Sequence, residues 1–127
     1  AEYEKEVSRR LLADFIIRAE DAVEKESDIA ADLRFGHDTG LLPLVGHIGI
    51  EGMDNWVSFD RVNSVWNSSV SICMGSNIQM IFYRNRTDDV LVKLMYNEKE
   101  TTIPALQTFS GPYYKWSDLK EYFKSLL

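Results

Sequence analysis

The stretch that decides the fold runs from residue 33 to residue 44 and reads Leu33-Arg34-Phe35-Gly36-His37-Asp38-Thr39-Gly40-Leu41-Leu42-Pro43-Leu44. In residues 29–36, apolar and polar side chains alternate and a glycine closes the run, which predicts a strand. In residues 39–50, leucine, valine and isoleucine recur at helical spacing, and Pro43 is tolerated because it falls within the predicted first turn. The predicted order is therefore strand, tight turn and helix.

His37 and Asp38 fall where the predicted strand ends and the predicted helix begins. Ligands of open α/β sheets bind at such junctions, and a helix start offers a phosphate free backbone N–H groups and the positive end of a dipole. A turn after Gly36 can bring both side chains into one cleft. The residue types alone leave a structural role equally open, in which Asp38 is the N-cap of the helix and His37 is a hydrogen-bonded residue of the turn.

The chain before this stretch has the pattern of an amphipathic helix. Apolar residues recur every four positions in residues 4–25. On the solvent side, Glu6 and Arg10 have the spacing of an ion pair, and so do Asp14 and Arg18. This face is predicted to be solvated.

The chain after this stretch predicts a small antiparallel sheet and a closing helix. Residues 78–83 and 90–96 are rich in branched and aromatic side chains and flank the polar residues 84–89, which predicts a β-hairpin. A short third strand is expected at residues 100–103, and a helix is expected to start near Lys115. One strand-then-helix unit predicts an α/β protein, whereas the isolated piece, with its incomplete sheet, is predicted to be α+β.

The composition is that of one globular domain, with 127 residues of which 45% are hydrophobic and 27% charged. The net charge of −6 argues against nucleic acid or an anionic membrane as a partner, because both require a basic surface. No apolar run is long enough to span a bilayer. The one cysteine, Cys73, cannot form an intramolecular disulfide and is expected to be a buried, inert thiol rather than a reactive one. Residues 56–69 are irregular and predict a loop with a short helix.

Several runs of sequence resemble one family. Residues 36–44, quoted above, are similar to the C-terminal catalytic motif of the histidine acid phosphatases, the branch of the histidine phosphatase superfamily that includes phytases and multiple inositol polyphosphate phosphatases. Residues 76–83 and 90–97 resemble the paired strands that follow this motif, and residues 112–119 resemble the start of the terminal helix. The resemblance implies that residues 1–127 are the C-terminal fragment of a phosphoglycerate mutase-like catalytic domain.

The resemblance also implies a reaction and roles for the motif residues. The reaction is hydrolysis of phosphomonoesters, including inositol polyphosphates, through a phosphohistidine. His37 would bind the transferring phosphoryl group, Asp38 would donate a proton to the leaving alcohol, and Thr39 and Gly40 would contact the substrate. No cofactor and no metal are implied. Many inositol polyphosphate phosphatases have His-Ala-Glu at this position, whereas this chain has His37-Asp38-Thr39, which leaves the substrate subclass open.

The family's nucleophile lies in an Arg-His-Gly-x-Arg motif, and this motif does not occur in the 127 residues. The other histidine, His47, is expected to have a packing or helix-surface role. Arg34 is expected to form a structural ion pair with Asp32 or another residue. Because the nucleophile motif is absent, the fragment alone is expected to be inactive.

The resemblance finally implies partners and a compartment. The expected partners are the phosphomonoester substrate and the missing N-terminal part of the enzyme, and the compartment is expected to be periplasmic or extracellular. Uncovered apolar side chains, including Leu33, Phe35, Ile81 and Phe82, predict a symmetric homodimer of the isolated chain. The alternative is a non-catalytic binding or assembly module on a phosphatase-like framework.

Overall fold

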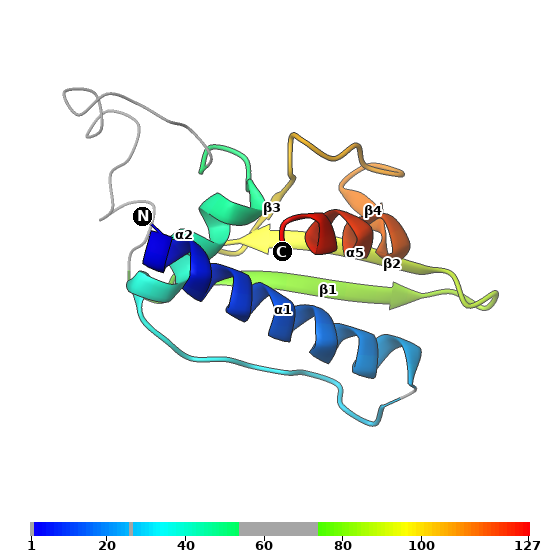
Figure 1. Ribbon diagram of the computed structural model, residues 1–127. Helices are drawn as coiled ribbons and strands as arrows, with labels where there is room; N and C mark the ends of the chain where they lie inside the picture. The colour runs from blue at the N-terminus through cyan, green and yellow to red at the C-terminus, as the bar shows by residue number, and fades with distance from the viewer. Residues whose placement is uncertain (1, 26, 54–73) are drawn as a thin grey trace.

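The computed structural model describes residues 2–25, 27–53 and 74–127 (Figure 1). Its elements are the helices α1 (Glu2–Glu24) and α2 (Asp38–Ile48), the strands β1 (Ile78–Arg84), β2 (Val90–Tyr96), β3 (Lys99–Thr101) and β4 (Tyr113–Lys115), and the helix α5 (Trp116–Ser125). The described part is thus a mixture of helices and an antiparallel sheet, which is the α+β class predicted for the isolated piece.

The sheet is built around β2, which every other strand contacts. β1 pairs with β2 along its whole length, from Ile78 opposite Tyr96 to Arg84 opposite Val90. β3 and β4 each pair antiparallel with a different part of β2, so they share its second edge. The predicted hairpin is confirmed, and the third strand is confirmed at a slightly earlier position than predicted. The three-residue strand β4 was not predicted.

The helices lie over one face of the sheet, with α1 and α5 side by side in front of β1 and β2 (Figure 1). The core lies between the two layers. Its buried side chains come from the described helices, from β2 and β4 and from the segment after β3, and they include Leu12, Ile16, Leu44, Val45, Ile48, Val92, Leu94, Ile103, Tyr114, Leu119 and Phe123.

The first helix follows its sequence pattern closely. Leu12, Ile16, Ala19 and Val23 are buried on one side, while the predicted ion pairs lie on the exposed side, with 3.0 Å between the charged groups of Glu6 and Arg10 and 3.9 Å between those of Asp14 and Arg18. Such exposed pairs contribute only about 0.3–0.5 kcal/mol each. The stability of α1 therefore comes mainly from its apolar side.

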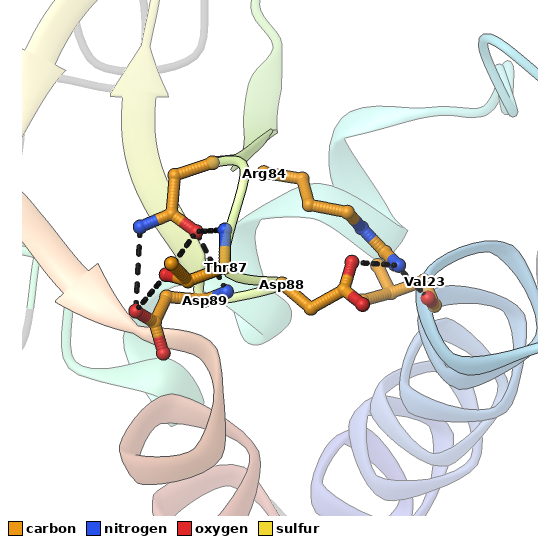
Figure 2. Close-up of polar contacts among 6 residues, drawn as sticks. Val23, Arg84, Thr87, Asp88 and Asp89 are labelled. Atoms are coloured by element: carbon orange, nitrogen blue, oxygen red, sulfur yellow. Dashed lines mark hydrogen bonds and ion pairs between the residues drawn. The ribbon is translucent and has the colours of Figure 1, made fainter.

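The C-terminal end of α1 is held by the hairpin. The last turn of this helix contains no basic residue. Arg84, at the end of β1, donates a hydrogen bond to the carbonyl of Val23 and pairs with Asp88 (Figure 2). A cation from another element therefore offsets the negative end of the helix dipole.

The hairpin turn is closed by one side chain. The Asn85 side-chain oxygen accepts hydrogen bonds from the backbone N–H groups of Thr87 at 3.0 Å and Asp89 at 2.9 Å, and from the Thr87 hydroxyl at 2.9 Å (Figure 2). Asp88 adopts the left-handed conformation, with φ of 63°. The predicted polar turn is thus confirmed, and its conformation is fixed by asparagine and aspartate, which tolerate it well.

The predicted strand at residues 29–36 is wrong. These residues run as an extended, irregular segment beside α1 and belong to no sheet (Figure 1). The physical reason is that a strand requires a neighbouring backbone, and none of the described strands lies next to this segment. The strand-then-helix unit that supported the α/β class is therefore absent from the described part of the chain.

The second helix begins earlier than its predicted first turn. Because α2 starts at Asp38, Pro43 lies in the second turn rather than the first, so the expected position of the proline is wrong. Because Pro43 has no N–H, the carbonyl of Thr39 lacks its helical hydrogen bond. The helix continues nevertheless, because its apolar side is anchored in the core. The predictions for residues 56–69 and for Cys73 lie outside the described residues.

Candidate functional site

The His37-Asp38 pair lies at the N-terminal end of α2. His37 is the N-cap residue, with an extended backbone (φ −109°, ψ 167°), and its carbonyl accepts the N–H groups of Gly40 at 3.0 Å and Leu41 at 3.2 Å. Asp38 is the first helical residue, and its carboxylate accepts the N–H of Thr39 at 2.9 Å. The alternative in which Asp38 is the N-cap is therefore wrong by one residue, although its carboxylate does satisfy a free N–H of the first turn.

The side chains of the pair are open to solvent. His37, Asp38 and Thr39 are exposed, and Gly40 is half-buried. The His37 imidazole makes no hydrogen bond to another described residue and does not cap the helix. The second alternative, a hydrogen-bonded turn histidine, is therefore not observed within the described ranges. The four residues that the motif predicts for the site do lie together, on one turn of helix.

The two glycines of the motif are not explained by local packing. A Cβ atom at Gly36 or at Gly40 would meet no atom within 4 Å, and neither residue has a positive φ. By contrast, Gly49, which ends α2, has φ of 82° and is required in the left-handed conformation. The fold therefore explains why residue 49 is glycine, whereas neither backbone conformation nor packing requires a glycine at Gly36 or Gly40.

The nearest arginine to the pair in sequence is engaged elsewhere. Arg34 forms an ion pair with Asp14 of α1 and lies over the ring of Phe15, 5.1 Å from its centroid. Asp32 pairs instead with Arg18, at 3.6 Å. The structural ion pair predicted for Arg34 is confirmed, with Asp14 as the partner.

His47 has the packing role predicted for it. Its Nε2 lies 3.0 Å from the carbonyl oxygen of Leu126, and its Nδ1 lies 2.7 Å from the hydroxyl of Ser8. Because a carbonyl only accepts, Nε2 carries a proton, and in the neutral ring Nδ1 accepts from the serine. His47 thus ties α2 to α1 and to the end of α5. Ser8, a buried polar residue among the apolar side chains of α1, was not predicted.

Two hollows of the described surface are lined by residues other than the pair. The larger, of about 590 Å³, lies between residues 106–109 and α5, and Lys115, Asp118 and Glu121 contribute its charged groups. The smaller, of about 280 Å³, is lined by Glu51 and Glu100 among others. Because acidic groups outnumber basic ones in both, neither favours a phosphate.

Within residues 2–25, 27–53 and 74–127, no group of three histidine, cysteine, aspartate or glutamate side chains could hold a metal ion. In the same ranges, no helix combines the length and the apolar character needed to cross a membrane.

Comparison with known proteins found no protein-family model and no curated protein that matches this chain.

Proposed function

We propose that this chain supplies the proton-donor half of a histidine acid phosphatase, which hydrolyses phosphomonoesters through a phosphohistidine. In this proposal His37 contacts the transferring phosphoryl group, and Asp38 protonates the departing alcohol oxygen. Thr39 and Gly40 contact the substrate. The nucleophilic histidine and the arginines that hold the phosphate come from a segment outside these 127 residues.

The observation that carries the proposal is the run 36–44 together with the place of its His-Asp pair. Both side chains are exposed at the start of a helix whose apolar side, Leu44, Val45 and Ile48, is buried in the core. A group that acts on a substrate held by another segment has to be firmly mounted and unobstructed. The position of His37 and Asp38 supports such a role.

The motif glycines support the same function. A glycine within a helix lowers stability by about 1 kcal/mol relative to alanine, yet Gly40 occupies the first turn of α2 with open space around it. Glycine is also used where a ligand comes close to the backbone. Close approach of a substrate to residues 36–40 would account for both glycines.

The acid role of Asp38 depends on the substrate. A carboxylate beside a phosphate dianion repels it, so the bound substrate favours the protonated aspartate, which is the form that donates. The proton then passes to the ester oxygen as the bond to phosphorus breaks. Esters with a poor leaving group need this proton most.

The direct test is Asp38→Asn in the protein that carries both this chain and the nucleophile motif. Hydrolysis of an alkyl phosphate should slow by on the order of a hundredfold or more, and hydrolysis of an aryl phosphate by much less. Asp28→Asn, which changes another exposed aspartate, should leave both rates unchanged. Equal losses on the two esters would remove Asp38 from the acid role.

A second prediction concerns the chain alone. Without the nucleophile motif, the purified 127-residue protein should not hydrolyse an aryl phosphate or inositol hexakisphosphate. Turnover that survives purification and is abolished by His47→Ala would show that the nucleophile had been assigned wrongly. A parent sequence without an Arg-His-Gly-x-Arg motif would favour the binding-module alternative.

A further inference from the structure

Residues 29–36, which we call the strap, present two different sides. Asp32 and Arg34 point towards α1, where they pair with Arg18 and Asp14. In an extended chain the intervening side chains point the opposite way. Accordingly Leu33 is 74% exposed and Phe35 is 93% exposed. The strap is thus fixed to α1 by charges, and its apolar side faces solvent.

The backbone of the strap is also unpaired. The N–H of Ile29 bonds to the Ser27 hydroxyl, but residues 30–36 make no backbone hydrogen bond to any other described residue. Extended backbone with free donors and acceptors is the edge that another strand pairs with. The partner it fits is therefore a second extended segment.

We propose that this second segment is the strap of another copy of the chain, paired antiparallel about a two-fold axis at Leu33. The sequence of the strap is complementary to itself in this register. Asp32 lies opposite Arg34 of the partner subunit, Ala31 lies opposite Phe35 of the partner subunit, and the two leucines meet on the axis. Each Asp32 carboxylate then lies between two guanidinium groups, and the large phenylalanine ring packs beside the small alanine.

The neighbouring symmetric registers are worse for stated reasons. Moving the axis to Asp32 places two aspartates opposite each other, and moving it to Arg34 places two arginines opposite each other; like charges in directly opposed positions destabilise a strand pair. An axis that falls between two residues places the apolar side of one strap on the polar side of the other. Among these neighbouring registers, the one centred on Leu33 places opposite charges together and keeps the apolar side chains on one side.

This pairing has a consequence for the His37-Asp38 end of the strap. Continuing the register by two residues beyond the pair of Phe35 and Ala31 places Ile29 of the partner subunit opposite His37. The partner thus contributes an apolar side chain next to the exposed imidazole. The proposal does not rest on phosphatase activity, because it follows from the strap alone.

The first test is the mass of the 127-residue chain by light scattering over a concentration series. Dimers should form as the concentration rises, and Leu33→Asp, which places two carboxylates on the axis, should raise the dissociation constant by at least about tenfold. Phe109→Asp makes a similar change at an exposed phenylalanine outside the strap and should have no effect. A chain that stays monomeric, or a dimer that Leu33→Asp leaves intact, would overturn the proposal.

The second test fixes the register by disulfide trapping in a Cys73→Ser background. Leu33→Cys places two thiols directly opposite each other, at about 4.5–5.5 Å between Cα atoms, which a disulfide can span. Phe35→Cys places the two thiols four residues apart along the ribbon, roughly 14 Å, which it cannot. Efficient cross-linking at position 35 and none at position 33 would show that another register, or another partner segment, is used.

Discussion

The tyrosine that closes the core, Tyr114, offers the sharpest test of the fold. Its hydroxyl accepts the backbone N–H of Ile103 at 2.8 Å and donates to the carbonyl of the same residue at 3.2 Å. Tyr114 is 1% exposed and Ile103 is fully buried. The Ile103 carbonyl also accepts the N–H of Leu106 at 3.0 Å, so Tyr114→Phe leaves one buried group, the N–H of Ile103, without a partner.

The size of the effect follows from this one group. An unsatisfied buried donor costs about 1–3 kcal/mol, so its loss should lower the free energy of unfolding by roughly 2 kcal/mol. For a domain of this size this corresponds to a fall in Tm of roughly 8 °C. Urea denaturation should show a lower midpoint with an unchanged slope, because the surface exposed on unfolding hardly changes.

Tyr113→Phe is the matched control. Tyr113 is half-buried, and its ring packs edge-on against Tyr83 at 5.7 Å, a contact that phenylalanine keeps. This variant should change the free energy of unfolding by less than about 0.5 kcal/mol. A Tyr114→Phe protein as stable as the control would show that the hydroxyl does not hold Ile103 in solution.

The same hydroxyl predicts a pH dependence. Burial raises the pKa of Tyr114 above its ordinary value of 10.0, against a smaller opposing effect of its hydrogen bond to Ile103. A phenol whose pKa is raised by folding stabilises the protein fully below its unfolded pKa, and this contribution is lost as the pH rises beyond it. Stability should therefore fall above pH 10.0. The fall should be shallower in Tyr114→Phe.

Two further predictions concern a helix end and an ion pair. Gly49→Ala should lower Tm by more than Gly52→Ala. Both glycines have a positive φ, which costs an L-residue about 1–2 kcal/mol, but only at Gly49 would the new methyl group also lie 3.4 Å from the Tyr122 hydroxyl. Equal falls in Tm would show that this contact does not matter. The Lys120 hydrogen bond lowers the pKa of Glu24 from 4.5, so the stability that this pair adds is present above pH 4.5 and is lost as the pH falls further. Lys120→Ala should therefore reduce the fall in Tm at acid pH, while it changes the stability at neutral pH by less than about 1 kcal/mol. An unchanged fall in Tm at acid pH would contradict the pairing.

Elements whose pattern repeats along the chain could be predicted from the sequence. The four-residue recurrence of α1 and the two branched runs of the hairpin correspond to elements that form largely from local preferences. The position of His37 and Asp38 at the start of a helix was also predicted, because the leucines that follow them have helical spacing. Their chemical roles remain predictions.

The remaining features depend on neighbours that a local pattern does not contain. The alternation in residues 29–36 correctly indicated two different sides, but whether an extended segment becomes a strand depends on another backbone beside it. β4 has three residues and is defined by its pairing with β2, not by its own sequence. The bond between Ser8 and His47 joins residues 39 positions apart, so neither residue predicts it.

The ion pairs of α1 with α5 have a consequence for how the chain is made. Lys120 pairs with Glu24 across 96 positions, and Lys124 pairs with Glu20. On the ribosome, α1 is therefore complete long before the helix that packs beside it has been translated. At roughly 5–20 residues per second the delay is on the order of 5–20 s. Throughout that interval the apolar side of α1 lacks the cover of α5, and among the described helices only α2 is available to pack against it.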